Sequence, residues 1–432
     1  MIHGDVVKGV MSFAEMENMM YKIEGEDLYI TSSLALPFLS ENLSELAQNY
    51  KLFGTEALKK YKLKTVVPKT HLKVGSGIDF FDTECSVEIE GELMSPSKLV
   101  ELYESNKFIP LSDGTRAIID KNFFLRLKRL LGKQQKDGTY KISFFDMPLV
   151  DGLINAKIDN AENETLPWQT FFSGFNKIQN QKVEDLPVTK LLRDYQKYGL
   201  QWLSYLTENN LGACLADDMG LGKTIQTISL LATRYANGME GQTIVIVPKS
   251  LIDNWISELS KFAPELSVYA YYGVERDMGE AKKHQIILTT YAVARNDIES
   301  LQKENFEYAV LDEVQQIKNT ASQSSKAVML LNAKHRIALS GTPMENNLGE
   351  LYSIFRFLNP AMFGTEGEFN RRYGSPIQKD GDEDAAKELS AKIRPFILRR
   401  LKQEVAKELP ERTEQVIYVD MSPAQAAVYE KQ

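Results

Sequence analysis

Residues 214–231 read CLADDMGLGKTIQTISLL, and this stretch decides the fold of the carboxyl-terminal half of the chain. An apolar run ends at Ala216, two glycines follow, and from Lys223 onward the apolar residues recur at helical spacing. Such a strand, loop and helix suits nucleotide phosphates, because glycine allows close backbone approach and a helix N-terminus carries positive partial charge. The general pattern G-x-x-x-x-G-K-S/T has a glycine where this chain has Asp217, so the match is incomplete.

The composition is that of a soluble globular protein. The chain has 432 residues, of which 43% are hydrophobic and 25% charged, and this length favours two or three domains. We find no apolar run long enough to cross a membrane and no secretory signal. Two cysteines, Cys85 and Cys214, and four scattered histidines predict no structural metal and a reducing, cytoplasmic setting. The net charge of −8 argues against a wholly basic nucleic-acid binder but leaves room for basic patches.

Short apolar runs alternate with helical patterns after about residue 186. Near-continuous apolar strands between helices predict an α/β fold with a parallel sheet covered on both faces. Ligands bind such sheets beyond the carboxyl ends of the strands, so the polar residues that end each run are the candidate site. The runs are GACLAD, TIVIVP, IILTTY, YAVLDE and RIALSGT.

The glycine-containing loop predicts an ATP site. Lys223 is expected to reach the β- and γ-phosphates, and Thr224 to place its hydroxyl on Mg²⁺. A chance glycine turn before a helix is the alternative, and the strand–loop–helix setting argues against it. The predicted ATP-binding residues of the loop are Asp217, Asp218, Met219, Gly220, Leu221, Gly222, Lys223 and Thr224.

A pair of carboxylates ends the run YAVLDE. Phosphoryl transfer needs an acid in the Mg²⁺ shell and a base that orients water. We therefore predict that Asp312 holds Mg²⁺ with Thr224, and that Glu313 is the general base beside Lys223. Solvated turn acids are the alternative, since acidic residues are common where strands end.

The order of several further motifs resembles that of the Snf-type (Swi/Snf-like) ATPases of helicase superfamily two, over about residues 186–432. The family form of the phosphate loop contains the acidic residues, which accounts for the missing glycine. Val314 stands where the family usually has Ala, a small departure. The segments that carry the resemblance are LRDYQ, ADDMGLGKT, VPKSLIDNW, TTY, DEVQ, LSGTP and IRPFILRRLKQEVAKELPERTE.

The resemblance implies a RecA-like first motor lobe and a role for each motif. Gln196 would read the adenine base. The implied DNA-binding residues, to which Arg295 is added as a loop cation, are Lys249, Trp255, Thr290, Tyr291 and Arg295. The residues implied in coupling hydrolysis to movement are Ser340, Gly341 and Thr342. For each DNA contact, an ordinary loop residue is the alternative.

A basic run near the end of the lobe leaves three interpretations open. Its members either face DNA, brace two lobes, or pair with the acids of residues 379–388. They are Arg394, Arg399, Arg400 and Lys402.

The domain organisation is expected to be an α+β accessory region at 1–185, a RecA-like ATPase lobe at 186–412, and a connection at 413–432. Residues 77–116 resemble the helicase-associated region of bacterial members. Alternation predicts strands in 77–94, and helical spacing predicts helices in 46–63, 99–111 and 121–134. The last of these is basic and either faces DNA or is a solvated helix face. A protein partner of this region is a further expectation.

The resemblance implies a DNA-dependent ATPase that uses ATP and Mg²⁺ and translocates on double-stranded DNA. The chain stops at Gln432, before the second lobe and its arginine finger, so we expect it to bind Mg·ATP but hydrolyse it poorly. We expect a cytoplasmic, nucleoid-associated protein, monomeric by default. The alternatives are another superfamily-two helicase acting on RNA or single strands, and a nucleotide-binding scaffold that never hydrolyses.

Overall fold

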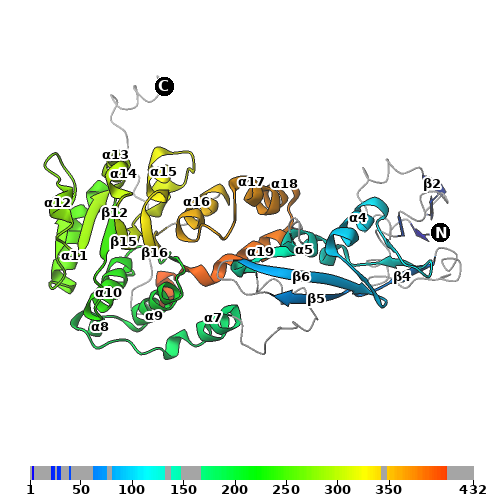
Figure 1. The fold of residues 1–432 in the computed structure, drawn as a ribbon, viewed down its shortest axis with the longest axis horizontal. Coiled ribbons are helices and arrows are strands. Elements are labelled where there is room, and N and C mark those ends of the chain that lie inside the picture. The colour runs from blue at the N-terminus through cyan, green and yellow to red at the C-terminus, as the bar shows by residue number, and fades with distance from the viewer. Residues whose placement is uncertain are drawn as a thin grey trace, which may run out of the picture.

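The structure is a computed structural model in which a sheet-based lobe and the amino-terminal region lie side by side along the longest axis (Figure 1). It describes residues 2–3, 21–24, 27–30, 38–39, 62–74, 80–131, 138–146, 167–341 and 348–405. The helix predicted for 46–63 and the connection at 413–432 therefore lie almost wholly outside the described residues.

Seven of the described strands form one parallel sheet. Five of them coincide with the apolar runs named from the sequence, and β13 and β17 are additional strands. The order β13-β14-β12-β15-β16-β11-β17 brings the phosphate-loop strand next to the last strand of the lobe. Every neighbouring pair is parallel, and the central strands are buried on both faces. The bounds are β11 (Ala213–Leu215), β12 (Gln242–Val247), β13 (Val268–Ala270), β14 (Ile286–Thr290), β15 (Asn305–Leu311), β16 (Asn332–Leu339) and β17 (Ile397–Leu398).

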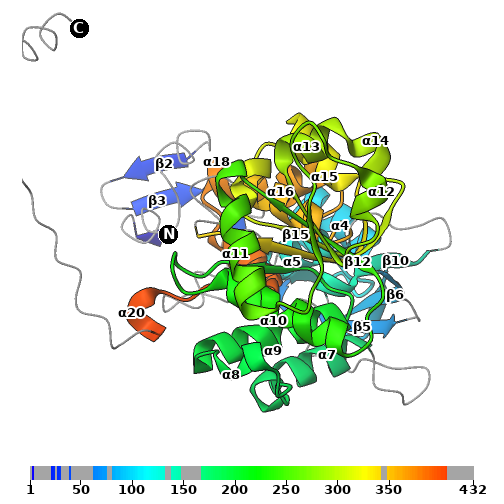
Figure 2. The ribbon, with the colours of Figure 1, turned by 90° about the vertical axis from the view of Figure 1, so that its left-hand side faces the viewer.

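Different helices cover the two faces of the sheet (Figure 2). Side chains alternate along each strand, so Val245 and Val247 of β12 join one apolar cluster while Ile244 and Ile246 join the other. The first cluster includes buried side chains from α9 (Asp194–Glu208), α10 (Lys223–Ala236) and α11 (Ile252–Phe262). The second contains α13 (Tyr291–Asn296), α15 (Gln323–Met329) and one side of α16 (Leu348–Leu358).

A group of helices after α16 lies between the sheet and the amino-terminal region (Figure 1). These helices are α17 (Glu366–Phe369), α18 (Ser375–Asp380) and α19 (Glu383–Ile393), and the chain then returns to the sheet as β17. The remaining short helices of the lobe are α8 (Pro187–Lys190), α12 (Met278–Ala281), α14 (Ile298–Leu301) and α20 (Lys402–Val405).

The amino-terminal region is an α+β unit built around one long strand. β6 pairs antiparallel with three other strands, which confirms the strands predicted in 77–94. These strands are β5 (Lys69–Val74), β6 (Phe80–Ile89), β7 (Glu92–Met94) and β10 (Tyr140–Ser143). The other elements are β1 (Ile2–His3), β2 (Tyr21–Glu24), β3 (Asp27–Ile30), β4 (Leu63–Thr65), β8 (Ile109–Pro110), β9 (Arg116–Ile118), α4 (Pro96–Asn106), α5 (Lys121–Leu131) and α7 (Pro167–Phe175).

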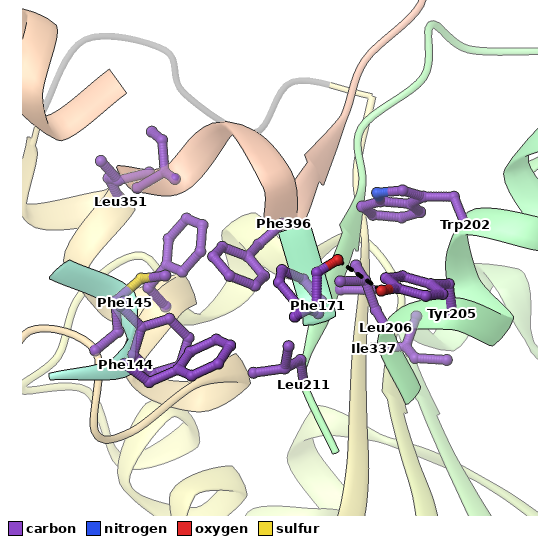
Figure 3. Packing of buried hydrophobic residues seen from close by; sticks show 14 of the residues in the cluster. Phe144, Phe145, Phe171, Trp202, Tyr205, Leu206, Leu211, Ile337, Leu351 and Phe396 are labelled. Atoms are coloured by element: carbon purple, nitrogen blue, oxygen red, sulfur yellow. Dashed lines mark hydrogen bonds between the residues drawn. The ribbon is translucent and has the colours of Figure 1, made fainter. Parts of the chain in front are cut away.

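An aromatic cluster joins the amino-terminal region to the lobe (Figure 3). Phe171 of α7 packs against Phe144 at 5.6 Å and against Phe396, next to β17, at 6.3 Å between ring centroids. The hydroxyl of Tyr205 in α9 donates to the backbone carbonyl of Phe171 at 2.6 Å. The apolar core is therefore continuous across the expected boundary near residue 185.

A buried ion cluster makes a second link between the same two parts. The carboxylate of Asp146 accepts hydrogen bonds from Arg372 at 2.9 and 3.1 Å and from Lys392 at 2.8 Å. Arg372 also donates to Glu388 of α19 at 3.0 Å. Burial by itself would raise the pKa of Asp146, but the cations Arg372 and Lys392 lower it.

The basic helix α5 takes part in this interface. Arg129 lies 3.3 Å from Glu388 and 3.5 Å from Asp382, and its side chain is largely enclosed. The helix predicted for this stretch is confirmed. The Arg129 guanidinium faces acids of the lobe. At this residue, therefore, the side chain neither faces DNA nor lies free in solvent.

Candidate nucleotide site

Three neighbouring strands end at one edge of the sheet in residues that the sequence predicted for the site. β11 leads into residues 217–222, β15 into Asp312 and Glu313, and β16 into Ser340 and Gly341. The order β15-β16-β11 places these endings side by side. Because ligands of parallel α/β sheets bind at this edge, the loop, the carboxylate pair and the coupling residues surround one candidate site.

The loop conformation depends on two glycines. Gly220 and Gly222 have φ values of +85° and +78°, in the left-handed region that L side chains avoid. A Cβ at Gly222 would lie 2.5 Å from Nε2 of Gln196, so a side chain has no room there. Helix α10 begins at Lys223 with no side-chain cap, which leaves its first N–H groups for an anion.

The ammonium of Lys223 lies among carbonyls and carboxylates. Its Nζ donates to the backbone oxygen of Asp217 at 2.8 Å and to that of Asp218 at 3.4 Å. Burial lowers the pKa of Lys223, while the charges of Asp217, Asp312, Glu313 and Asp218 oppose that shift. The interaction of Lys223 with both carboxylates of the pair means that the two motifs form one electrostatic unit.

Asp312 is a buried carboxylate held by two donors. Oδ2 accepts from the indole Nε1 of Trp255 at 2.8 Å, and Oδ1 accepts from the backbone N of Glu313 at 2.8 Å. Burial raises the pKa of Asp312, and the bond from Trp255 lowers it. A carboxylate oxygen can accept further interactions, so this group fits a divalent cation that would offset its desolvation.

Glu313 sits in an unusual backbone conformation, with φ of +48°. Left-handed geometry at a non-glycine residue costs of order 1–3 kcal/mol and is common at functional sites. Its carboxylate accepts a hydrogen bond from Nε2 of Gln315 at 2.6 Å, and Oε1 of Gln315 accepts from the hydroxyl of Ser340 at 3.0 Å. A chain of hydrogen bonds therefore connects the predicted base with the predicted coupling segment.

Gly341 lies directly against the phosphate loop. A Cβ at this position would come 3.0 Å from Cγ of Met219 and 3.8 Å from Nζ of Lys223. Thr342, the third predicted coupling residue, lies outside the described residues. Thr224 is half-buried in the first turn of α10, and its role as a Mg²⁺ ligand stays a prediction.

Both the oxygen and the nitrogen of the Gln196 amide take part in hydrogen bonds within the protein. Oε1 accepts from the backbone N of Arg193 at 2.9 Å and thereby caps α9, while Nε2 donates to the carbonyl of Leu221 at 3.1 Å. The side chain fastens the start of α9 to the phosphate loop. Reading of adenine by Gln196 stays a prediction.

The residues predicted for DNA fall into two groups. Lys249 and Arg295 are exposed. Lys249 begins a short 3-10 helix that follows β12, and Arg295 lies in the last turn of α13, the helix that follows β14. Thr290 is buried and its hydroxyl caps α13 by accepting from the backbone N of Val293 at 3.2 Å.

The two predicted aromatic DNA contacts need correction. Trp255 is wholly buried with its indole N–H on Asp312, and Tyr291 is nearly so, with its hydroxyl donating to the Asp312 carbonyl at 2.7 Å. Both rings fill the core beneath the end of β15, so neither is placed to contact a duplex. The sequence signal was an aromatic residue close after a buried strand, which suits core packing as well as a loop contact.

Sequence reasoning missed the partners of Asp217. Its carboxylate is wholly buried and accepts from Arg400, whose Nε lies 2.8 Å from Oδ1, and from Nε2 of Gln226 at 3.3 Å. Arg400 therefore pairs with the phosphate loop, not with the acids of 379–388, and it is too enclosed to face DNA. The available signal was an acid at the usual glycine position together with a late basic run.

These features are those of the first lobe of a RecA-like ATPase fold. A family model described as "SNF2-related domain" matches residues 195–432, and the chain belongs to this family. No helix among the described residues has the length and apolar character needed to span a bilayer.

Known proteins with similar sequence and structure agree with this assignment. The "Putative ATP-dependent helicase/translocase YwqA" of Bacillus subtilis is 37% identical over 359 residues, which cover 78% of this chain and 39% of that protein. "TATA-binding protein-associated factor 172" of Homo sapiens is 37% identical over 283 residues, covering 59% of this chain and 15% of that one. The chain thus spans well under half the length of either relative.

A solved structure shares the fold of the lobe. The "Sulfolobus solfataricus SWI2/SNF2 ATPase core in complex with dsDNA" is 41% identical with a TM-score of 0.50, over 58% of this chain and 54% of that one. The expected family and the expected α/β fold are confirmed.

Proposed function

We propose that this chain binds ATP with Mg²⁺ at the loop 217–224 and serves as the first motor lobe of a DNA-dependent ATPase that translocates on double-stranded DNA. The observation that carries the proposal is that Lys223, which follows β11, and the pair Asp312 and Glu313, which follows β15, lie at the same edge of the sheet. Only β16 separates the two strands, and each carboxylate acts on the Lys223 charge. Thr224 and Asp312 would hold Mg²⁺, which when bound neutralises charge on the phosphate oxygens.

Hydrolysis would depend on Glu313. Its carboxylate is oriented by Gln315, and this supports a base that holds the attacking water in one direction. Gln315 is held in turn by Ser340, so Ser340, Gly341 and Thr342 are proposed to transmit the state of the site to the rest of the motor.

Duplex DNA is the proposed track. The solved Sulfolobus relative is described in complex with dsDNA, and this chain presents the exposed cations Lys249 and Arg295 in the helices that follow β12 and β14. Exposed cations suit contacts to the phosphate backbone, which position a protein without reading sequence. Thr290, Tyr291 and Trp255 would act indirectly by shaping these loops.

We further propose that this chain alone hydrolyses ATP slowly. The arginine that contacts the phosphate loop in the described residues, Arg400, is enclosed against Asp217 and is not free to stabilise a transferring phosphoryl group. Residues 1–185 would form an accessory region that also offers a surface for a protein partner. A monomeric, cytoplasmic, nucleoid-associated protein completes the proposal.

The test of the ATP site uses a fluorescent ATP analogue with Mg²⁺. Lys223→Ala is expected to abolish saturable binding, while Lys303→Ala, which changes an exposed lysine at the opposite end of β15, leaves binding intact. Glu313→Gln is expected to bind the analogue and to lose turnover. Unchanged binding by Lys223→Ala would disprove the site, and unchanged turnover by Glu313→Gln would disprove the assigned base.

The test of the track compares stimulation of turnover by duplex DNA, single-stranded DNA and RNA. Duplex DNA is expected to stimulate most, and Lys249→Ala or Arg295→Ala to weaken that stimulation while ATP binding stays unchanged. Stimulation by single strands or RNA alone would point to another kind of superfamily-two helicase. Tight ATP binding with no turnover under any of these conditions would point to a scaffold.

A further inference from the structure

The guanidinium group of Arg400 donates hydrogen bonds through all three of its nitrogens. Nε donates to Oδ1 of Asp217 at 2.8 Å, and Nη2 donates to Oδ2 of Asp217 and, at 2.8 Å, to Oε1 of Gln226. Nη1 donates to the carbonyl of Tyr195, and the guanidinium carbon lies 5.2 Å from the centroid of the Tyr195 ring. Arg400 is 9% exposed, so one enclosed side chain ties its own segment to the phosphate loop and to α9 and α10.

The main chain around Arg400 runs beside the phosphate loop. The parallel pairing of β17 with β11 continues beyond both strands, because Ala216 N donates to Leu398 O at 2.7 Å and Asp218 N donates to Arg400 O at 3.1 Å. Lys402 N then donates to Oδ2 of Asp218 at 3.0 Å. The position of the loop is thus tied to residues 397–402 by backbone and side-chain contacts together.

A glycine in α9 makes room for this arrangement. A Cβ at Gly199 would lie 1.8 Å from Oε1 of Gln226 and 3.0 Å from Nη2 of Arg400. Any side chain at this position would displace the two groups that hold Asp217. The helix that carries Gln196 is therefore packed directly onto the Arg400 cluster.

The stability of the fold is a weak explanation for such a pair. A buried ion pair often contributes little net stability, because desolvation of the two charges offsets their attraction. A fully bonded guanidinium does, however, restrict its partner to one geometry. Here the restricted partner is Asp217, whose backbone carbonyl accepts the 2.8 Å hydrogen bond from the Lys223 ammonium.

We propose that Arg400 is a positioning residue for nucleotide binding: by clamping the Asp217 carboxylate, it sets the path of the phosphate loop and the place of the Lys223 ammonium. This inference rests on the proposed ATP site. The Arg400 clamp also joins the phosphate loop to residues 397–402. Nucleotide binding and the position of that segment influence each other, since linkage between two coupled sites is reciprocal.

The experiment measures affinity for the fluorescent ATP analogue with Mg²⁺, well below the melting temperature of each variant. Arg400→Lys keeps the positive charge but removes the planar set of guanidinium donors. Asp217→Asn keeps the shape of the side chain but removes its negative charge. Each is expected to weaken binding by roughly tenfold or more, as loss of a charge-assisted contact would. Arg399→Ala, which changes the exposed neighbour, is the matched control and is expected to bind normally.

The double variant Asp217→Asn with Arg400→Lys tests whether the two residues act as one unit. The affinity of the double variant is expected to equal that of whichever single variant binds the analogue less tightly, because both changes remove the same contact. Circular dichroism establishes that each protein is folded. Should Arg400→Lys fail to fold, Asp217→Asn by itself decides the question.

Normal affinity in folded Arg400→Lys and Asp217→Asn would overturn the inference, even if both melt at lower temperature, because the pair would then be structural only. Lys223→Ala is measured in parallel. If Lys223→Ala loses binding while the Arg400 and Asp217 variants bind normally, the clamp alone is refuted. If Lys223→Ala itself binds normally, the nucleotide site is refuted.

Discussion

The indole Nε1 of Trp255 donates a 2.8 Å hydrogen bond to Oδ2 of Asp312, although one residue lies in α11 and the other follows β15. The Trp255 side chain is wholly buried, and Asp312 is 6% exposed. Burial raises the pKa of this carboxylate and the indole bond opposes that shift, so Trp255 favours the ionised form. The aromatic residue that motif order assigned to DNA thus supports the proposed magnesium site.

Trp255→Phe should move the acid limb of ATP turnover to higher pH. The variant loses the donor to Asp312, so the pKa of that carboxylate rises further and the ionised form is lost earlier as the pH falls. Turnover is measured against pH in the presence of Mg²⁺. Trp202→Phe is the control, because it removes a buried indole bond of 3.0 Å to the Pro395 carbonyl, away from the site. An unshifted profile in folded Trp255→Phe would contradict this role.

Asp146→Ala should strongly destabilise the folded chain. It removes the shared partner of Arg372 and Lys392 and leaves two enclosed cations without it, a change that typically costs about 3–5 kcal/mol. Urea unfolding measures the free energy. Glu104→Ala, which breaks the exposed ion pair with Lys128, is expected to cost no more than about 1 kcal/mol. Equal effects of the two variants would show that the Asp146 cluster does not hold the parts together.

His335 should make the fold sensitive to acid. Burial lowers its pKa from 6.5 to about 4, with Glu307 opposing the shift and Lys334 and Arg234 adding to it. The unfolded chain therefore binds more protons than the folded chain between pH 6.5 and 4. Stability contributed by neutral His335 is present above pH 6.5 and is lost as the pH falls toward 4.

The measurement is the unfolding free energy across this pH range in the parent and in His335→Phe, which keeps a ring beside Tyr308, whose centroid lies 4.8 Å from that of His335. The variant is expected to show a shallower acid dependence. His284→Phe serves as the control, because it makes the same change at a partly exposed histidine. Parallel curves for parent and His335→Phe would rule out the prediction.

Ser340→Ala should slow turnover with little change in ATP affinity. It removes the hydroxyl donor to Gln315 and so loosens the amide that orients Glu313. A hydrogen bond worth about 0.5–1.5 kcal/mol predicts a fall in kcat of roughly two- to tenfold. Ser300→Ala, at an exposed position, is the control. A higher KM with unchanged kcat would instead place Ser340 in substrate binding.

Local features could be predicted closely from the sequence. The helical pattern KTIQTISLLATRYA coincides with α10, because a left-handed Gly222 and regular apolar spacing determine its start and its buried face. The central strands were also predictable, since fully buried strands consist of near-continuous apolar residues. The two-residue strand β17 was not, because its ladder with β11 is visible only when the sheet is assembled.

The sequence by itself determined the class of fold, the phosphate loop and the carboxylate pair, because glycine conformation, apolar periodicity and strand endings are local properties of the chain. Only the tertiary structure decided which side chains meet. Trp255 reaches Asp312 across 57 residues and Arg400 reaches Asp217 across 183, and no local pattern contains such a pairing. Hydrogen-bond partners are chosen by distance in the packed core, and that distance exists only after the sheet and its helices have come together.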